Sequence, residues 1–339
     1  MNKKVFIAGV MFIMIFTLNI KCEKVCDLNE VLKLKQLIVK DEYMYLIEEF
    51  KIYIYSMKTK KLIGSFGKKG EGPGEFIYFS NMIVGKNKIS IDSENKILFF
   101  SKKGEFINEF RKGFNCNKLF PIKNNYVGFS IDFGTKDINK VLLYNVYDNK
   151  FKIVRTIGNN EYIGKLLKKI RTKKKYDDYI PQVKKFFAVY KQKIFLGDPG
   201  KGIYFEVFDY NGKPLRIISG NYKKVKMTAK FKNDYINKLK SSNDWERVKA
   251  KKNIIFKQKL PCYRWFLINN EKMFLFTYKI ENNQREYLIT NMNGKIIKKS
   301  FIANVPKGLI SINKGYIYYT LENEEDELWE LHRQKIFNN

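Results

Sequence analysis

Along most of the chain, short stretches of alternating apolar and polar residues are separated by turn-forming residues. The clearest series lies in residues 66–110, where four such stretches follow one another: Met82–Val84, Lys88–Asp92, Ile97–Phe100 and Glu105–Phe110. A period of two residues is typical of β-strands, and the polar or glycine-containing segments between them predict tight turns. Four short strands that follow one another in antiparallel order form one blade of a β-propeller.

A glycine-rich loop precedes these strands. Four glycines and Pro73 fall within residues 67–74. Glycine and proline supply the backbone angles of consecutive tight turns, so this segment is predicted to be neither helix nor regular strand. No helix is predicted after the loop, so its glycines indicate turns rather than a phosphate-binding site.

Three motifs in this stretch resemble those of a known family. They are Gly70-x-Gly72-Pro73-Gly74-x-Phe76, Ile89-x-Ile91-Asp92-Ser93-x-Asn95 and Phe100-x-x-x-Gly104-x-Phe106. The stretch resembles the NHL-type repeats and the related six-bladed propeller lipoproteins of bacteria. Outside residues 66–110 the resemblance weakens to a strand–turn–strand pattern, as in residues 208–217. It implies six blades and an exported bacterial lipoprotein.

Weaker copies of the pattern recur at blade-like spacing. They close five further blades, at residues 51–66, 141–157, 203–218, 286–301 and 308–336. We therefore predict an all-β, six-bladed β-propeller with short helical insertions between blades, over residues 27–339, and a monomer. Ring closure removes an exposed sheet edge, so we expect strand residues near Val31–Val39 to pair beside the C-terminal strands.

Two insertions interrupt the repeat, at residues 159–182 and 221–260. Successive strands of a blade alternate in direction, so each connection from an outermost strand to the next innermost strand emerges on the same face. Both insertions are such connections, and we expect them side by side on the face that carries the Gly70–Phe76 loop. Short helices are predicted for residues Ala229–Lys240 and Ser242–Lys252.

These insertions are strongly basic. The chain has a net charge of +31, and the insertions carry twenty basic residues against six acidic ones. We predict that this basic face binds an unknown protein, a lipid head group or an acidic polysaccharide. The predicted partner-binding residues are Lys165, Lys168, Lys169, Arg171, Lys173, Lys174, Lys175, Lys223, Lys224 and Lys226.

A compositional explanation of this charge stays open. Lysine outnumbers arginine 57 to 8, and isoleucine, asparagine and tyrosine are frequent, as expected when codons drift toward A and T. The lysines would then be solvated surface without a partner. Nucleic acid is not a predicted partner, because export separates the chain from it and arginine, which reads base edges, is scarce.

The N-terminus has the layout of an export signal. Lys3 and Lys4 precede an apolar run over residues 5–16, so residues 1–21 are predicted to be a signal peptide or an N-terminal anchor. Cys22 resembles the lipidation site of bacterial lipoproteins, although Lys21 stands where such sites usually carry a small residue. The predicted location is exported, periplasmic or on the outer surface, and membrane-tethered; cleavage elsewhere and a retained anchor are the alternatives.

Few residues offer catalytic chemistry. His332 is the single histidine, which excludes a multi-histidine metal centre and disfavours a Ser-His-Asp triad. The cysteines, at positions 22, 26, 116 and 262, lack the spacing of a metal site. We assign no catalytic residue, metal ligand or cofactor, and predict a binding or scaffold protein rather than an enzyme.

One enzymatic alternative remains, a divalent-metal (calcium) dependent hydrolase or lactonase with its site in the central channel. Such a site needs only oxygen ligands. Asp92, Asp132 and Asp198 are candidates near the predicted inner strands, but Asp92 and Asp198 stand in the sequence context of turn aspartates. None is assigned as a ligand.

Overall fold

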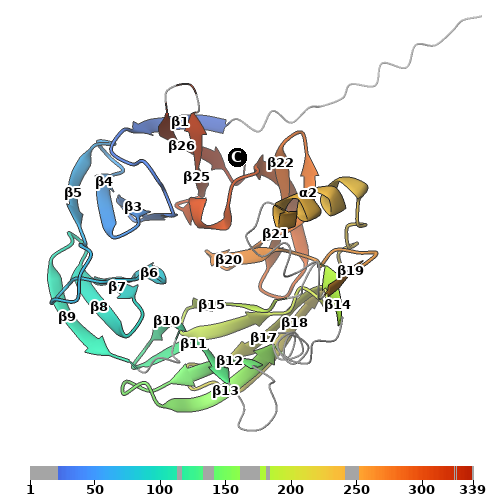
Figure 1. Ribbon diagram of the computed structural model, residues 1–339, viewed down its shortest axis with the longest axis horizontal. Coiled ribbons are helices and arrows are strands. Elements are labelled where there is room, and N and C mark those ends of the chain that lie inside the picture. Colours follow the sequence, from blue (N-terminus) through green and yellow to red (C-terminus); the bar gives the residue numbers. More distant parts are fainter. Residues whose placement is uncertain are drawn as a thin grey trace, which may run out of the picture.

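The protein is a six-bladed β-propeller. The computed structural model describes residues 22–112, 117–132, 141–160, 176–180, 184–240, 252–323, 325 and 327–337. Within these residues, the strands form six four-stranded antiparallel sheets around a central axis and one separate two-stranded sheet (Figure 1). The fold class predicted from the alternating pattern is confirmed.

The first three blades each run outward from an innermost strand at the channel. Blade 1 contains β2 (Gln36–Lys40), β3 (Tyr43–Glu48), β4 (Lys51–Ser56) and β5 (Leu62–Phe66). Blade 2 contains β6 (Asn81–Val84), β7 (Lys88–Asp92), β8 (Lys96–Ser101) and β9 (Phe106–Arg111). Blade 3 contains β10 (Asn117–Ile122), β11 (Asn125–Asp132), β12 (Val141–Tyr147) and β13 (Ile153–Asn160).

The other three blades follow the same order. Blade 4 contains β15 (Phe186–Tyr190), β16 (Lys193–Gly197), β17 (Ile203–Phe208) and β18 (Pro214–Gly220). Blade 5 contains β20 (Trp265–Asn269), β21 (Lys272–Glu281), β22 (Gln284–Asn291) and β23 (Ile296–Ala303). Blade 6 contains β24 (Ile310–Asn313), β25 (Tyr316–Asn323), β26 (Leu328–Lys335) and β1 (Cys22–Leu28).

The hydrophobic core is divided among the interfaces between neighbouring blades. Six clusters of buried apolar side chains are found within the described residues, and each joins two adjacent blades. Phe76, at the end of the glycine-rich loop, is fully buried in the cluster between blades 1 and 2. Each blade is thus stabilised by its two neighbours, as expected when a repeat cannot bury its faces alone.

Tight turns between third and fourth strands fit one blade against the previous one. Gly104 and Gly294 have φ values of +90° and +86°, in the region that favours glycine. A Cβ atom would lie 2.6 Å from the Phe66 ring at Gly104 and 2.5 Å from the Ser219 carbonyl oxygen at Gly294. The glycine of the Phe-x-x-x-Gly motif is therefore required by close packing as well as by turn geometry.

The ring is closed by strands from opposite ends of the chain. Strand β1 pairs antiparallel with β26, in a register that places Cys22 opposite Gln334 and Leu28 opposite Trp329. The predicted position of the closing strand was wrong. Residues 36–40 form β2, the innermost strand of blade 1, and the closing strand lies earlier, at Cys22–Leu28, because the outermost place in blade 6 is the one left open.

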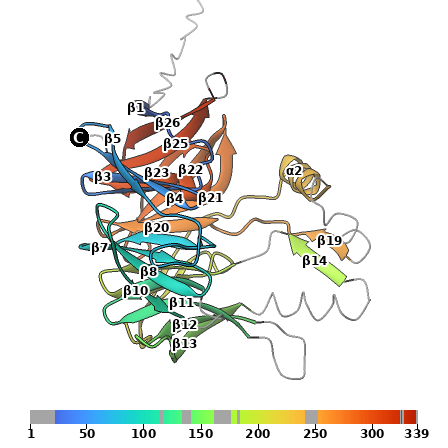
Figure 2. The same cartoon turned by 60° about the vertical axis from the view of Figure 1, so that its left-hand side comes forward.

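The two insertions lie side by side on one face. Strand β14 (Tyr176–Ile180) from the first pairs in parallel with β19 (Lys252–Phe256) from the second. Helix α2 (Ala229–Lys240) forms where the sequence predicts it, and the Thr228 hydroxyl caps it by accepting the Phe231 N–H (3.1 Å). In Figure 2 these elements project from one side of the disc. The second predicted helix falls mainly on residues outside the described ones, and its last residue, Lys252, begins β19.

No helix within the described part of the chain is long and apolar enough to cross a membrane. Residues 1–21, which carry the predicted export signal, lie outside that part.

Ion pairs reinforce the closing strands and make them sensitive to acid. Glu330 on β26 contacts Lys24 on β1 and His332, and hydrogen bonds from these groups lower the pKa of Glu330 to about 2. A lowered carboxyl pKa stabilises the fold above the unfolded value of 4.5, and this stabilisation is lost as the pH falls toward 2.

We expect Glu330→Gln to lose less thermal stability than the parent between neutral and acid pH, measured by circular dichroism; parallel losses would contradict this role.

A buried ion pair joins the ends of two strands in blade 2. The Lys112 ammonium lies 2.5 Å from Asp92, and both side chains are about 1% exposed. Burial raises the pKa of Asp92, although Lys112 opposes the shift. This partner accounts for an aspartate that the sequence had offered as a possible channel ligand.

Removal of Lys112 should strongly destabilise the protein. Lys112→Met leaves the Asp92 carboxylate buried without its counter-ion, which typically costs about 3–5 kcal/mol of unfolding free energy. The loss should grow as the pH rises from 3.8 to the raised pKa of Asp92 in the folded variant and should stay constant above it, because the unfolded state ionises first and the folded state then holds an uncompensated charge. Denaturant unfolding at two pH values measures both effects. Lys58→Met, at an exposed turn, is the control and should change stability by less than about 0.5 kcal/mol.

Candidate anion-binding site

A ring of basic residues surrounds one mouth of the central channel. Five blades carry a basic residue just before, or at, the start of their innermost strand, on the insertion face. We call these residues the mouth ring: Lys35, Lys118, Lys184, Arg264 and Lys307. The equivalent place in blade 2 holds Ser80 and Asn81. Within the described residues, only Lys35 of the mouth ring has an ion-pair partner, Glu49 at 3.8 Å.

The channel below this ring is basic and apolar. A cavity of about 540 Å³ is lined by the innermost strands of all six blades. Among the described residues, its lining includes Lys35, Lys40, Lys118 and Lys307 but no aspartate or glutamate. Elsewhere in the described part of the chain, no group of three His, Cys, Asp or Glu residues is placed to hold a metal ion. Positive charge repels calcium, so the channel lining does not favour the hydrolase alternative.

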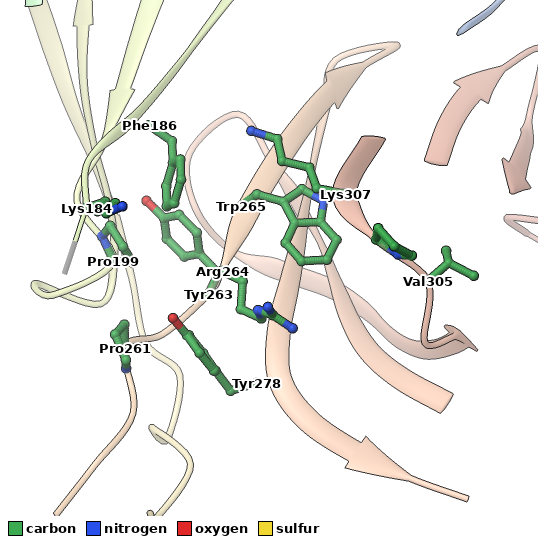
Figure 3. Close-up of a pocket in the computed structure, with 11 residues that line it drawn as sticks. Lys184, Phe186, Pro199, Pro261, Tyr263, Arg264, Trp265, Tyr278, Val305 and Lys307 are labelled. Carbon is green, nitrogen blue, oxygen red and sulfur yellow. The ribbon is translucent and has the colours of Figure 1, made fainter. Parts of the chain in front are cut away.

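A smaller pocket opens on the insertion face, between blades 4, 5 and 6. Its volume is about 330 Å³. Figure 3 shows Lys184, Pro199 and Pro261 on one side, Lys307 and Val305 on the other, and aromatic rings between them. The charged residues of the lining that the structure describes are Lys184, Arg264 and Lys307, and no carboxylate is among them.

A short turn holds Lys307 at the pocket. Pro306 precedes a 3₁₀ turn, η1 (Lys307–Leu309), and Leu309 is buried in the core between blades 6 and 1. Gly308 lies so close to blade 1 that a Cβ atom would be 2.5 Å from the Lys35 carbonyl oxygen. The backbone next to Lys307 is therefore held by the core and by blade 1, which places the Lys307 Cα at the edge of the pocket.

The Lys307 ammonium is poorly compensated. Lys307 is exposed as a whole residue, but the blades around its ammonium displace part of the surrounding water. This desolvation together with nearby Lys118 lowers the pKa of Lys307 from 10.5 to about 8. The nearest favourable contact described is the Phe186 ring, whose centroid lies 5.2 Å from Nζ. An anion at this place would stabilise the protonated form.

Arg264 is held by aromatic rings rather than by a carboxylate. Its guanidinium lies 5.5 Å from the rings of both Trp265 and Tyr278. Beneath it, buried Arg285 lies 5.5 Å from the Trp265 ring, and burial lowers the pKa of Arg285 to about 10. Stacking on rings orients the Arg264 guanidinium and leaves its N–H edge available for an anionic group.

The second insertion borders this pocket. Lys224 Nζ donates to the Gly200 carbonyl (2.6 Å), next to Pro199 of the lining. Phe231 of α2 packs against Tyr278 with ring centroids 6.1 Å apart. The Leu260 N–H donates to the Val225 carbonyl (2.9 Å), just before the chain enters the pocket at Pro261.

Only three of the ten predicted partner-binding residues lie in the described part of the chain. Lys223, Lys224 and Lys226 lie in the segment that borders the pocket. The other predicted partner-binding residues, Lys165, Lys168, Lys169, Arg171, Lys173, Lys174 and Lys175, lie outside the described residues. Whether these ten residues bind a partner stays a prediction.

Other candidates from the sequence have local partners. Asp198 accepts the Gly200 N–H (3.0 Å), in the turn role expected of it. Asp132 ends β11, and its side chain is outside the described part. His332 lies on β26 and contacts Glu330 (2.8 Å). The Cys22 sulfur lies 2.7 Å from the Tyr319 hydroxyl, and lipidation of Cys22 stays a prediction.

Sequence reasoning missed the mouth ring and the pocket. Arg264, Lys184 and Lys307 lie outside the two basic insertions, and none of them belongs to a motif. A signal did exist: a basic residue recurs at the start of the innermost strand in several blades. Aligning the blades by strand order would have revealed it.

Comparison with known proteins supports the fold. No family model matches the chain, and no curated protein matches it. A DUF4221 family member from Bacteroides vulgatus ATCC 8482 has a similar structure, with a TM-score of 0.53 and 12% identity over 93% of this chain and 97% of that chain. The β-propeller domain of Myceliophteria thermophila Cps50 (Swd1) aligns with a TM-score of 0.44 and 8% identity, over 92% and 99% of the two chains. At 12% identity, the similarity to the DUF4221 family member shows the fold alone.

Replacement of Lys307 should stabilise the ligand-free protein. The lowered pKa of Lys307 means that its charged form destabilises the folded state. This destabilisation is complete below pH 8 and absent above about 10.5. We expect Lys307→Met to raise the thermal midpoint near pH 7 by about 1–3 °C, since solvent contact reduces the effect. The gain should fade between those pH values, and Lys58→Met should show no gain. Unchanged or lower stability of Lys307→Met near pH 7 would contradict the interpretation that the charged Lys307 destabilises the folded protein.

Proposed function

We propose that this protein is an exported, membrane-tethered binding propeller that captures an acidic polysaccharide on its insertion face. The observation that carries the proposal is the mouth ring, four of whose five basic residues have no carboxylate partner within the described residues. Cations that converge on one concave surface focus a positive field and attract polyanions.

The geometry of the tether favours a partner away from the membrane. Strand directions alternate within blade 6, so β1 runs from the face opposite the insertions toward the insertion face. Cys22 begins β1 and therefore lies near the opposite face. A lipid on Cys22 would hold that face at the membrane and direct the mouth ring outward. This arrangement favours an extracellular polymer over the head groups of the anchoring membrane.

The proposal is tested by polymer binding to residues 22–339 with Cys22→Ser, which keeps β1 intact. We expect polygalacturonate to bind, and the binding to weaken steeply as salt rises from about 0.05 to about 0.5 M, because salt screens the attraction. Neutral dextran should not bind. Replacing the ten predicted partner-binding residues by glutamine should weaken polygalacturonate binding by tenfold or more.

A matched control separates location from net charge. It replaces ten exposed lysines in turns or strand ends on the opposite face, with the same loss of charge: Lys58, Lys60, Lys61, Lys103, Lys150, Lys152, Lys193, Lys213, Lys295 and Lys314. This variant should keep most of its binding. Equal weakening of both variants, or tighter binding to anionic lipid vesicles than to polygalacturonate, would contradict the proposal.

A further inference from the structure

The pocket between blades 4, 5 and 6 has the electrostatic character of an anion site. Lys307 and Arg264 enter it from different blades, and neither has a carboxylate partner within the described residues. Buried Arg285 adds positive charge beneath Trp265. Cations left unpaired in a concave site favour a bound anion, because the ligand supplies the missing counter-charge.

The rest of the lining suits a small ring with hydroxyl groups. Tyr278 and Phe186 are half-buried and expose part of their rings. The Tyr278 hydroxyl has no hydrogen-bond partner within the described residues, and burial raises its pKa, so it stays a neutral donor. Pro199 and Pro261 add apolar walls. The volume of about 330 Å³ lies at the lower end of ligand pockets, which fits one ring rather than a long chain.

We propose that this pocket binds one acidic sugar unit, with its anionic group attracted by the cations of the lining and its ring against the half-buried aromatic side chains. The inference rests on the proposed function and names the part of the polysaccharide that the propeller recognises. A sugar ring presents an apolar C–H face to aromatic rings and hydroxyl groups to tyrosine, whereas a bare inorganic anion uses only the two cations. The anionic group is a carboxylate or a phosphate, and the experiment distinguishes them.

Isothermal titration calorimetry on residues 22–339 with Cys22→Ser tests this pocket, using glucuronate, glucose 6-phosphate, glucose and inorganic phosphate. We expect one or both acidic sugars to bind at least tenfold more tightly than glucose and than inorganic phosphate. Lys307→Met should lose tenfold or more in affinity for the acidic sugar, and its thermal midpoint near pH 7, which should not fall, reports that the fold is intact. Lys58→Met should bind like the parent.

Tyr278→Phe separates recognition of the sugar from attraction of the anion. It removes only the hydroxyl, so affinity for the acidic sugar should fall about three- to tenfold while any weak binding of inorganic phosphate is unchanged. Glucose that binds as tightly as both acidic sugars, inorganic phosphate that binds as tightly as the tighter of the two acidic sugars, or full affinity in Lys307→Met would each overturn the pocket assignment. Polygalacturonate capture measured on the same variants shows whether the wider proposal fails too: capture that persists without sugar binding overturns the pocket alone.

Discussion

The antiparallel pairing of β1 with β26 is the contact on which the rest of the structure depends. Each blade is stabilised by packing against two neighbours, so an open ring would lose the interface between blades 6 and 1 and leave one face of each of these blades unpacked. Val25 and Leu28 of β1 enter the core between blades 6 and 1, beside Leu37 and Leu331. Closure by strands from both ends of the chain therefore joins the sequence termini through hydrogen bonds and through shared apolar burial.

A closed ring also determines which residues come together at a possible binding site. The innermost strands all start at the same face, so residues before those strands converge on one channel mouth although they are far apart in sequence. The long connections between blades emerge on that same face, which places the second insertion beside the pocket through Lys224 and Phe231. Anchoring near Cys22, on the opposite face, would leave this surface free.

Much of the fold could be predicted from the sequence because its signals are local. Alternation of apolar and polar residues identified strands in all six blades, the glycine at position 104 marked a turn, and the helix at Ala229–Lys240 was found to the residue. The closing strand was misplaced because β1 reads C-E-K-V-C-D-L, without clear alternation. Its place is decided by pairing with residues about three hundred positions away, which no local pattern reports.

For the candidate site, the sequence by itself determined that charge is abundant, that the insertions are basic, and that catalytic motifs are few. Only the tertiary structure decided which cations act together. Lys307, Arg264 and Lys184 come from three different blades, and the packing of these blades brings them to one pocket with aromatic walls and no carboxylate among its described lining residues. The physical reason is that electrostatic interaction and burial depend on distance in space, whereas sequence patterns report only the neighbours of each residue along the chain.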